Sequence, residues 1–287
     1  MAARQSAILL IGCPDAKGLV ASVSGFLYEH GANILSADEH RDDASERFFM
    51  RIEWDLADFE LDDAAFRSAF RNRVAERFHM DWRVEYSHKP LRVAVFVSRY
   101  LHCLADLLHR HKTGELAADI RLIVSNHEDA QRHAGFYGIP FEYIPLQPDR
   151  KAEAESRQLA LLAEHGIDLV VLARYMQVLS PEFVARHAGR IINVHHSFLP
   201  AFSGAKPYHA AFERGVKLIG ATAHYVTEIL DDGPIIDQEV IRVSHRDQLE
   251  ELIEKGRDAE RMVLSRAVRW HLQHRVLLCG KKTVIFD

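Results

Sequence analysis

A trio of polar side chains in the C-terminal half of the sequence has the residue types and spacing of a site for acyl chemistry. Asn193 and His195 end the apolar run "IINVH", and Asp231 follows in the turn before Gly233. An amide and an imidazolium can stabilise the oxyanion that develops at a carbonyl carbon, while a carboxylate orients or deprotonates the attacking group. The trio therefore indicates attack on a carbonyl carbon without a seryl or cysteinyl nucleophile.

The position of the trio along its predicted strand favours a ligand site. After "IINVHH" the chain enters a loop rich in Pro, Gly and Ser, so the polar groups lie at the strand's carboxyl end, where open parallel sheets bind ligands. Alternate side chains of a strand point to opposite sides, so Asn193, His195 and Ser197 share one side. Val194 and His196 then face the other side, and His196 is expected to shape the loop.

A metal hydrolase is the alternative that these residue types leave open. Its ligands would be His195, His196, His224 and Asp231. Adjacent histidines on a strand point to opposite faces, however, and the sequence has no helical His-x-x-x-His motif. We therefore expect catalysis without a metal and without a permanently bound cofactor. His224 is expected to support the reacting groups, and Ser197, which lies behind them, to shape the loop together with His196.

The composition of the chain is that of a globular protein with a small-molecule ligand. Among 287 residues, 48% are hydrophobic and 27% are charged, the net charge is −5, and no basic block suits nucleic acid. No apolar segment approaches the roughly 18 residues that span a bilayer, and the N-terminus lacks the apolar core of a signal sequence. Cys13, Cys103 and Cys279 are far apart and odd in number, which argues against disulfides. We expect a cytoplasmic protein that binds neither nucleic acid nor membrane.

The pattern of elements changes at residues 87–90 and predicts two domains. Residues 1–86 read as strand, helix, strand, strand, helix, strand, an α+β sandwich whose sheet has one apolar face. In residues 91–287, short apolar runs such as "RVAVFVS" and "IDLVVLA" alternate with helical segments, which is typical of parallel strands buried on both faces. The predicted fold class is α/β: a βαββαβ sandwich, a linker at 87–90, and a doubly wound, mostly parallel Rossmann-like sheet.

Several separated motifs resemble a known family. "INVHHSFLPAF" and "GATAHYVTEILDDGPIIDQ" are similar to the folate-dependent formyltransferases, with their Asn-x-His pair and an Asp seven residues after a His. "SRYLHCLADLLHR" and "LARYMQVLSPEFV" resemble the deformylase branch of this family, and "CPDAKGLVASVSGFLYEHGANIL" resembles an ACT domain. The likeness covers nearly the whole chain and implies an ACT domain followed by a sheet of the formyltransferase type.

The resemblance also implies a substrate and the roles of site residues. Asn193, His195 and Asp231 would catalyse the hydrolysis of 10-formyltetrahydrofolate to formate and tetrahydrofolate, a hydrolase reaction of one-carbon metabolism that bears on purine biosynthesis. The folate pocket would be lined by Tyr175, Met176, Gln177, Val178, Leu179, Thr227, Glu228, Ile229, Leu230 and Gly233.

Two other functions stay open. A formyltransferase would pass the formyl group to an amine such as glycinamide ribonucleotide, whose phosphate suits a Gly-rich loop after the first strand of the sheet. This chain has "VSRYLHCLADLL" there, without glycine, and the side chains of Arg99, Tyr100 and Leu101 would obstruct such a loop, so water is the expected acceptor. The other candidate is an amino-acid-binding regulator without catalysis, against which the complete Asn, His and Asp set argues.

The ACT-like domain is expected to sense a small amino acid and to take part in a homo-oligomer, a dimer or a tetramer. Its free edge strands can pair with another subunit. Because the reaction removes a one-carbon donor, glycine and methionine are the first effectors to test. The resemblance places the effector near the turns after the first strand and after the first helix, at Asp15, Gly18, Leu19, Gly31, Asn33 and Ile34.

Overall fold

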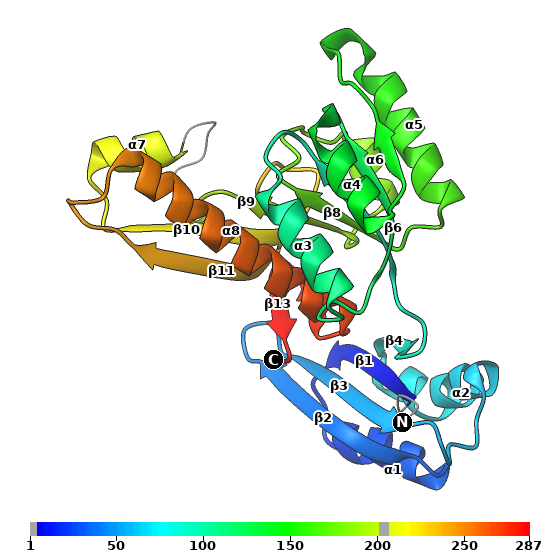
Figure 1. Ribbon diagram of the computed structural model, residues 1–287. Helices are drawn as coiled ribbons and strands as arrows, with labels where there is room; N and C mark the ends of the chain where they lie inside the picture. The colour runs from blue at the N-terminus through cyan, green and yellow to red at the C-terminus, as the bar shows by residue number, and fades with distance from the viewer. Residues whose placement is uncertain (1–4, 201–206) are drawn as a thin grey trace. The chain divides into compact units, whose positions relative to one another are not determined.

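The computed structural model describes residues 5–200 and 207–287, and this part of the chain forms two compact units (Figure 1). The first unit consists of the residues up to Pro90 together with His274–Cys279 and Val284–Asp287. The second unit consists of Leu91–Gln273 and Gly280–Thr283. The sequence-based range of 91–287 for the second domain does not anticipate this return of the chain to the first unit.

The first unit is built on an antiparallel four-stranded sheet with the strand order β2-β3-β1-β4. Its elements are β1 (Ser6–Pro14), α1 (Leu19–Glu29), β2 (Asn33–Asp42), β3 (Arg47–Asp55), α2 (Asp63–Phe70), the helical turns Arg71–Ala75 and Glu76–Phe78, and β4 (Asp81–Tyr86). Because side chains alternate along a strand, Leu9 and Ile11 of β1 point to one face, where Phe26 of α1 and Phe66 and Phe70 of α2 complete the core.

The second face of this sheet is covered by the end of the chain. Strands β12 (Val276–Cys279) and β13 (Lys282–Ile285) pair with each other, and Leu277 and Phe286 pack against Ile8, Leu10 and Phe49. The prediction of a sheet with one apolar face is therefore wrong. The sequence of β1 is apolar at both sets of alternate positions, and the second set needs the C-terminal residues as partners.

The second unit is built on a seven-stranded sheet. Its strands are β5 (Arg92–Val97), β6 (Asp119–Ser125), β7 (Phe141–Tyr143), β8 (Leu169–Ala173), β9 (Ile191–His195), β10 (Leu218–Tyr225) and β11 (Ile235–Arg242). The strand order is β11-β10-β9-β8-β5-β6-β7, in which β10 is antiparallel to both of its neighbours and the remaining pairs are parallel. The prediction of an α/β fold with a mostly parallel sheet is confirmed.

Helices cover the sheet of the second unit. They are α3 (His102–Lys112), α4 (Gln131–Tyr137), α5 (Lys151–Glu164), α6 (Pro181–Arg186), α7 (Pro207–Arg214) and α8 (Leu249–Leu272), with short turns at Glu128–Ala130 and Pro148–Arg150. Helix α8 packs against β10, β11 and α3, as Figure 1 shows. It begins with a capping box, in which Gln248 and Glu251 satisfy each other's backbone N–H groups. Every residue of β8 is buried, as its unbroken apolar sequence requires.

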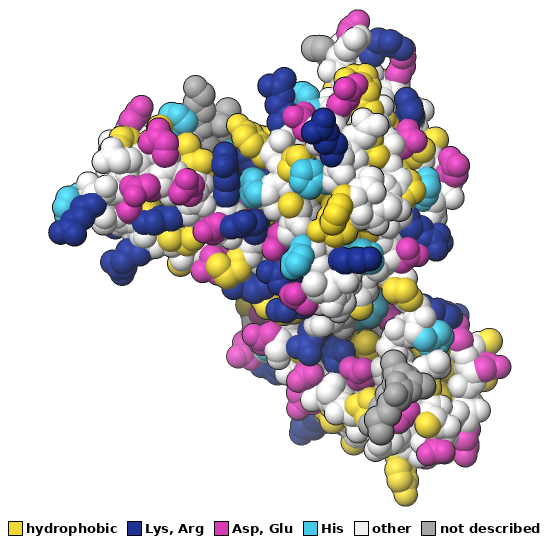
Figure 2. All heavy atoms as spheres, viewed as in Figure 1, with side chains coloured by type: hydrophobic (Ala, Val, Ile, Leu, Met, Phe, Trp, Pro, Cys, Tyr) yellow, Lys and Arg dark blue, Asp and Glu magenta, His cyan; other side chains and the backbone are white. Residues whose placement is uncertain are grey.

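The described surface carries charges of both signs. Figure 2 shows Lys and Arg side chains interspersed with Asp and Glu over the visible face. None of the helices in the described ranges combines the length and the apolar character that crossing a bilayer requires.

Candidate active site

Asn193 and His224 lie opposite each other on the antiparallel strands β9 and β10. Their side chains meet, with 3.2 Å between Asn193 Nδ2 and His224 Nε2. The other ring nitrogen of His224 lies 2.9 Å from the carbonyl oxygen of Tyr225, and because a carbonyl oxygen only accepts, this Nδ1 carries a proton. The Asn193 amide, which can only donate through Nδ2, directs one of its N–H groups at the Nε2 atom of His224. This contact orients the amide and leaves its second N–H for a ligand.

The Asp231 carboxylate lies between two histidines. Its Oδ2 atom is 3.2 Å from His195 Nδ1, and its Oδ1 atom is 3.7 Å from His224 Nε2. The hydrogen bond from His195 and the neighbouring His224 hold the pKa of this carboxyl well below its usual range, although burial acts in the opposite direction. Asp231 is therefore ionised at neutral pH. Asp231 contacts only Nδ1 of His195, and the buried Nε2 atom of this ring has no hydrogen-bond partner among the described residues.

The backbone of the site departs from ordinary conformations at two positions. Arg174 and Asp231 have φ angles of 62° and 56°, in the left-handed region that residues other than glycine adopt rarely. Such conformations persist only where the surrounding structure imposes them, and they cluster at functional sites. In the turn after Asp231, a Cβ atom at Gly233 would overlap the carbonyl oxygen of Tyr225. Glycine is therefore required at this point of the turn.

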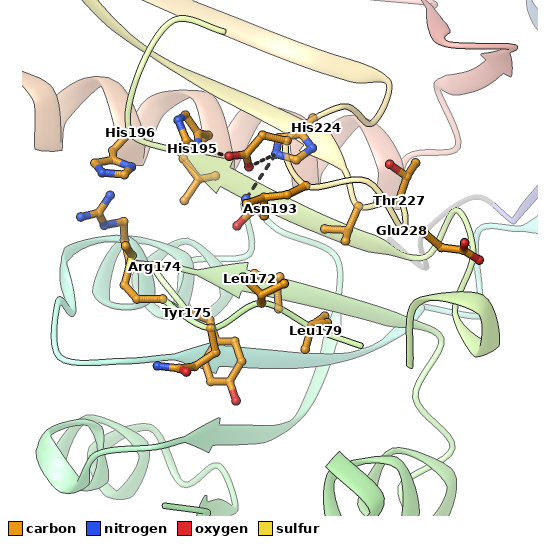
Figure 3. A pocket seen from close by; sticks show the side chains of 17 residues that line it. Leu172, Arg174, Tyr175, Leu179, Asn193, His195, His196, His224, Thr227 and Glu228 are labelled. Carbon is orange, nitrogen blue, oxygen red and sulfur yellow. Dashed lines mark hydrogen bonds and ion pairs between the residues drawn. The ribbon is translucent and has the colours of Figure 1, made fainter. Parts of the chain in front are cut away.

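His196 faces the cavity of the site, so the prediction that it points away is wrong. Strand β9 ends at His195, and the alternation of side chains stops with it. The centroids of the His195 and His196 rings are 5.1 Å apart, and Figure 3 shows His196 beside Arg174. Burial, followed by the charge of Arg174, lowers the pKa of His196 to about 4. His196 is therefore neutral at pH 7.

These side chains line one cavity with a volume of about 370 Å³ (Figure 3). The sequence-predicted residues on its surface are Tyr175, Met176, Gln177, Val178, Leu179, Asn193, His195, His224, Thr227, Glu228, Leu230 and Asp231. The lining residues that the sequence analysis did not assign to the site are Leu172, Arg174, Val194, His196 and Val226. Three assigned residues are not part of the lining, namely Ser197, Ile229 and Gly233.

Part of the cavity lining is apolar and exposed. The side chains of Met176, Val178 and Leu230 lie on the cavity and are exposed to solvent. Exposed apolar side chains around a pocket suit a ligand with a flat aromatic part. Tyr175, in contrast, is buried, and its hydroxyl accepts a hydrogen bond of 2.9 Å from Gln158 Nε2. It anchors the loop after β8 in the core.

Ser197 lies in the loop after β9, which buried polar groups hold in place. Thr222 Oγ1 donates a hydrogen bond of 3.0 Å to the Ser197 carbonyl and accepts one of 3.1 Å from the Leu199 N–H. Gln238 Nε2 donates to the Leu199 carbonyl at 3.1 Å. The backbone of Ser197 therefore takes part in fixing the loop, while its place behind the reacting groups stays a prediction.

A buried glutamate next to the cavity is the main feature that the sequence analysis missed. Glu260 is 1% exposed. Its Oε1 atom accepts a hydrogen bond of 2.6 Å from Tyr208 Oη, and its Oε2 atom lies 2.7 Å from His102 Nε2 and 3.4 Å from Arg174 Nε. Burial alone would raise the pKa of Glu260, but these partners outweigh burial and lower it. The signal in the sequence is a glutamate on the buried stripe of a long amphipathic helix, where an unpaired charge would be costly.

Glu260 also belongs to a group of side chains close enough to hold a metal ion, together with His102 and Cys103. The chemistry of the group does not suit a metal. Both carboxylate oxygens already have hydrogen-bond partners, and burial raises the pKa of the Cys103 thiol well above its usual value. Because the thiolate is the form that binds metals, the group is better described as a hydrogen-bond network.

The residues expected to bind an amino-acid effector lie at opposite ends of the first unit's sheet. Pro14 of β1 lies opposite Arg47, whereas Asn33 of β2 lies opposite Asp55, at the other end of β3. Helix α1 has 11 residues and therefore separates the two ends by about 16 Å. One group is Asp15, Gly18 and Leu19, and the other is Gly31, Asn33 and Ile34. A small amino acid cannot contact both groups of one chain.

Some of these residues also have structural tasks. The Asp15 carboxylate pairs with Arg41, at 2.6 Å, and Leu19 is buried in the core of the unit. Gly18 and Gly31 have φ angles of 88° and 76°, which glycine adopts without strain. The turns at both ends of α1 thus account for the glycines even without an effector.

Comparisons with known proteins agree with the geometry of both units. A formyl transferase family model matches residues 91–268, and an ACT domain model matches residues 7–71. The chain is 51% identical over 280 residues to the formyltetrahydrofolate deformylase of Bacillus subtilis (strain 168), covering 97% of this chain and 93% of that protein.

Solved structures give the same result. The structure of a formyltetrahydrofolate deformylase from Pseudomonas syringae pv. tomato str. DC3000 matches with a TM-score of 0.97 at 49% identity, covering 100% of this chain and 96% of that one. Glycinamide ribonucleotide transformylase 1 from Symbiobacterium toebii matches with a TM-score of 0.65 at 28% identity, over 69% of this chain and 95% of that one. The likeness to the first structure extends over the whole chain, and the chain belongs to the formyltetrahydrofolate deformylase family.

Proposed function

We propose that this protein hydrolyses 10-formyltetrahydrofolate to formate and tetrahydrofolate. The observation that supports the proposal best is the cluster of Asn193, His195 and Asp231 on the surface of a cavity that also exposes the apolar side chains of Met176, Val178 and Leu230. Such a cavity suits the flat pterin of a folate, and the cluster offers hydrogen-bond donors beside a carboxylate. These are the groups that attack on a carbonyl carbon requires.

Two donors are available for the oxygen of the formyl group. The Asn193 amide keeps one N–H after its contact with His224, and His195 Nε2 is buried without a partner among the described residues. As water attacks, the formyl oxygen becomes an oxyanion, and these donors stabilise it. When the C–N10 bond then breaks, protonated His195 delivers its Nε2 proton to N10.

Asp231 has two tasks in this mechanism. It accepts a hydrogen bond from Nδ1 of His195 and thereby fixes the orientation of the ring. Its free lone pairs also accept a hydrogen bond from water and direct the water oxygen toward the formyl carbon. A carboxylate with so low a pKa takes the water proton only as the new C–O bond forms.

The test is an assay of formate release from purified protein and 10-formyltetrahydrofolate without added amine or metal. We expect formate and tetrahydrofolate in equal amounts. Strict dependence on glycinamide ribonucleotide would instead identify a transferase. Loss of activity with a chelator and recovery with zinc would identify a metal hydrolase, the alternative in which the histidines and Asp231 bind a metal ion.

A formyltransferase remains the second candidate because the second unit is similar to a glycinamide ribonucleotide transformylase. The loop after β5 argues against it. The ring of Tyr100 lies there with the guanidinium carbons of Arg174 and Arg257 at 5.4 and 5.9 Å from its centroid. These side chains occupy the loop in which a phosphate would need free backbone N–H groups.

For the ACT domain we propose the binding of a small amino acid by a homo-oligomer. The two predicted groups of effector residues lie at opposite ends of α1, so a ligand that contacts both groups must lie between two copies of the chain. The test is calorimetric titration of the full chain with glycine and methionine, combined with light scattering. Binding without a second copy, or no binding of any of the twenty amino acids, would contradict the proposal.

A further inference from the structure

The guanidinium of Arg174 has hydrogen-bond donors that the described residues do not use. Arg174 lies on the cavity surface and is 8% exposed. Its Nε and Nη1 atoms are fully buried and have no hydrogen-bond partner among the described residues, and the same holds for Nε2 of His196. Buried polar atoms of this kind are costly to leave unpaired. They indicate a polar ligand at this end of the cavity.

Glu260 does not satisfy these donors. Its Oε2 atom is 3.4 Å from Arg174 Nε, which is close enough for charge attraction, but the angle does not make a hydrogen bond. The two carboxylate oxygens accept instead from His102 and Tyr208. Glu260 thus balances the charge of Arg174 in the protein interior, while the N–H groups of the guanidinium stay free for a small ligand.

The position of Arg174 relates it to the reacting groups. Figure 3 shows the guanidinium pointing toward His196, and the ring of His196 lies 5.1 Å from that of His195. The left-handed backbone of Arg174, with φ of 62°, brings the side chain to this place, and such a conformation in an arginine must be imposed by its surroundings. The donors therefore lie next to the place where the formyl carbon is attacked.

We propose that Arg174 and His196 form a subsite for formate, the small carboxylate that the reaction releases. This inference rests on the proposed hydrolysis and deepens it. The water oxygen forms the new bond to the formyl carbon, the C–N10 bond breaks, and N10 takes a proton from His195. The resulting formic acid loses its proton and leaves as an anion. The positive charge of the guanidinium and its unpaired N–H donors suit the oxygens of such a carboxylate.

The test is a titration of the full chain with ¹³C-labelled formate, followed by NMR line broadening, in the absence of folate. The wild-type protein should bind formate, and R174Q should bind it at least ten times more weakly. R174K keeps the positive charge but lacks the planar guanidinium group with its several N–H donors, so it should show an affinity for formate between those of the wild type and R174Q. H196N should weaken binding less than R174Q, since it removes one neutral donor. In steady-state assays, inhibition of hydrolysis by added formate should weaken in the same order.

The matched control is R257Q. Arg257 is exposed, its guanidinium carbon lies 5.9 Å from the centroid of the Tyr100 ring, and it is not part of the cavity lining. This variant therefore removes a nearby guanidinium and should keep wild-type affinity for formate. If R174Q fails to fold, the formate affinities of R174K and H196N still test the proposed subsite. Equal formate affinity in wild type, R174K and H196N would overturn the subsite, as would no formate binding by the wild type. Because binding is measured without substrate, a protein that binds formate but does not hydrolyse the folate would refute the proposed function alone.

Discussion

At the scale of single residues, the sequence was sufficient to locate Asn193, His195 and Asp231 but not all of their neighbours. The trio follows from residue types and from the end of an apolar run. His196 was assigned to the wrong side because period-two alternation holds only while the chain is extended, and β9 ends one residue earlier. Arg174 lies at a strand exit in a motif that the sequence analysis did identify, but its direction depends on a left-handed φ that no local pattern predicts.

The first prediction concerns the trio. Asn193→Ala, His195→Ala and Asp231→Asn should each remain folded and bind folate but turn over more slowly. We expect Asn193→Ala to lower kcat by about 10²- to 10³-fold, the usual effect of losing one oxyanion donor, and His195→Ala and Asp231→Asn by about 10²- to 10⁴-fold, the usual contribution of general acid–base catalysis. The measurement is formate release at saturating substrate. Asp232→Asn is the matched control, because the neighbouring Asp232 carboxylate pairs with exposed Lys281, and it should keep near wild-type kcat. Near-normal turnover of Asp231→Asn would contradict the role given to its carboxylate.

At the scale of elements, the register between paired strands brings together residues that no sequence motif relates. Asn193 and His224 are distant in sequence, yet the antiparallel pairing of β9 and β10 places them opposite each other. The sequence predicts both strands but not their register. His224 could therefore be placed near the site, but its contact with the Asn193 amide could not be predicted. Glu260 shows the same limit: its helix was predicted, but its partners come from α3, α7 and the loop after β8.

The second prediction concerns the turn between β10 and β11. Gly233→Ala would bring a Cβ atom into the carbonyl oxygen of Tyr225, so the turn must shift and move Asp231 away from His195. We expect a loss of about 1 to 3 kcal/mol in unfolding free energy and a fall in kcat. Gly135→Ala in α4 is the control, since its Cβ would meet no atom within 4 Å and alanine should stabilise the helix by up to about 1 kcal/mol.

Denaturant unfolding measures both variants. Equal stability of Gly233→Ala and the wild type, with unchanged kcat, would show that the turn adapts without consequence for the site.

At the scale of the whole molecule, the sequence predicted both folds because each has its own pattern of apolar residues. The alternation in β3 indicated an antiparallel sheet, and the continuous runs in β5 and β8 indicated parallel strands covered on both faces. What the patterns could not indicate is that residues at the two ends of the chain share a core. The contacts of Leu277 and Phe286 with β1 and β3 join positions more than two hundred residues apart, and no local pattern carries such information.

The third prediction concerns the pH dependence of stability. Burial lowers the pKa of both His196 and His274 from 6.5 to about 4, aided by neighbouring arginines. Between these values the unfolded chain binds protons that the folded chain does not, so stability should fall as the pH drops from 6.5 toward 4. Each histidine contributes up to about 3 kcal/mol to this fall. Asp231 contributes to the loss of stability only at lower pH, because its carboxylate, whose pKa is lowered in the folded protein, stabilises the fold until the pH falls below the usual pKa of an aspartate.

His274→Gln should flatten this dependence. The measurement is the thermal unfolding midpoint at pH 7 and pH 5, where the variant should lose less than the wild type. Exposed His88 lies in the same unit, and His88→Gln should leave the dependence unchanged. A slope in His274→Gln equal to that of the wild type would contradict the assignment.

The return of the chain's end to the first sheet has a consequence for synthesis on the ribosome. The residues Ile8, Leu10 and Phe49 of the apolar face are synthesised more than two hundred residues before their partners Leu277 and Phe286. Residues 91–273 belong to the other unit and must be translated in between. At about 5 to 20 residues per second, this takes roughly 10 to 40 s. For that time the first sheet of the nascent chain lacks these apolar partners, and transiently exposed apolar surface of this kind favours aggregation.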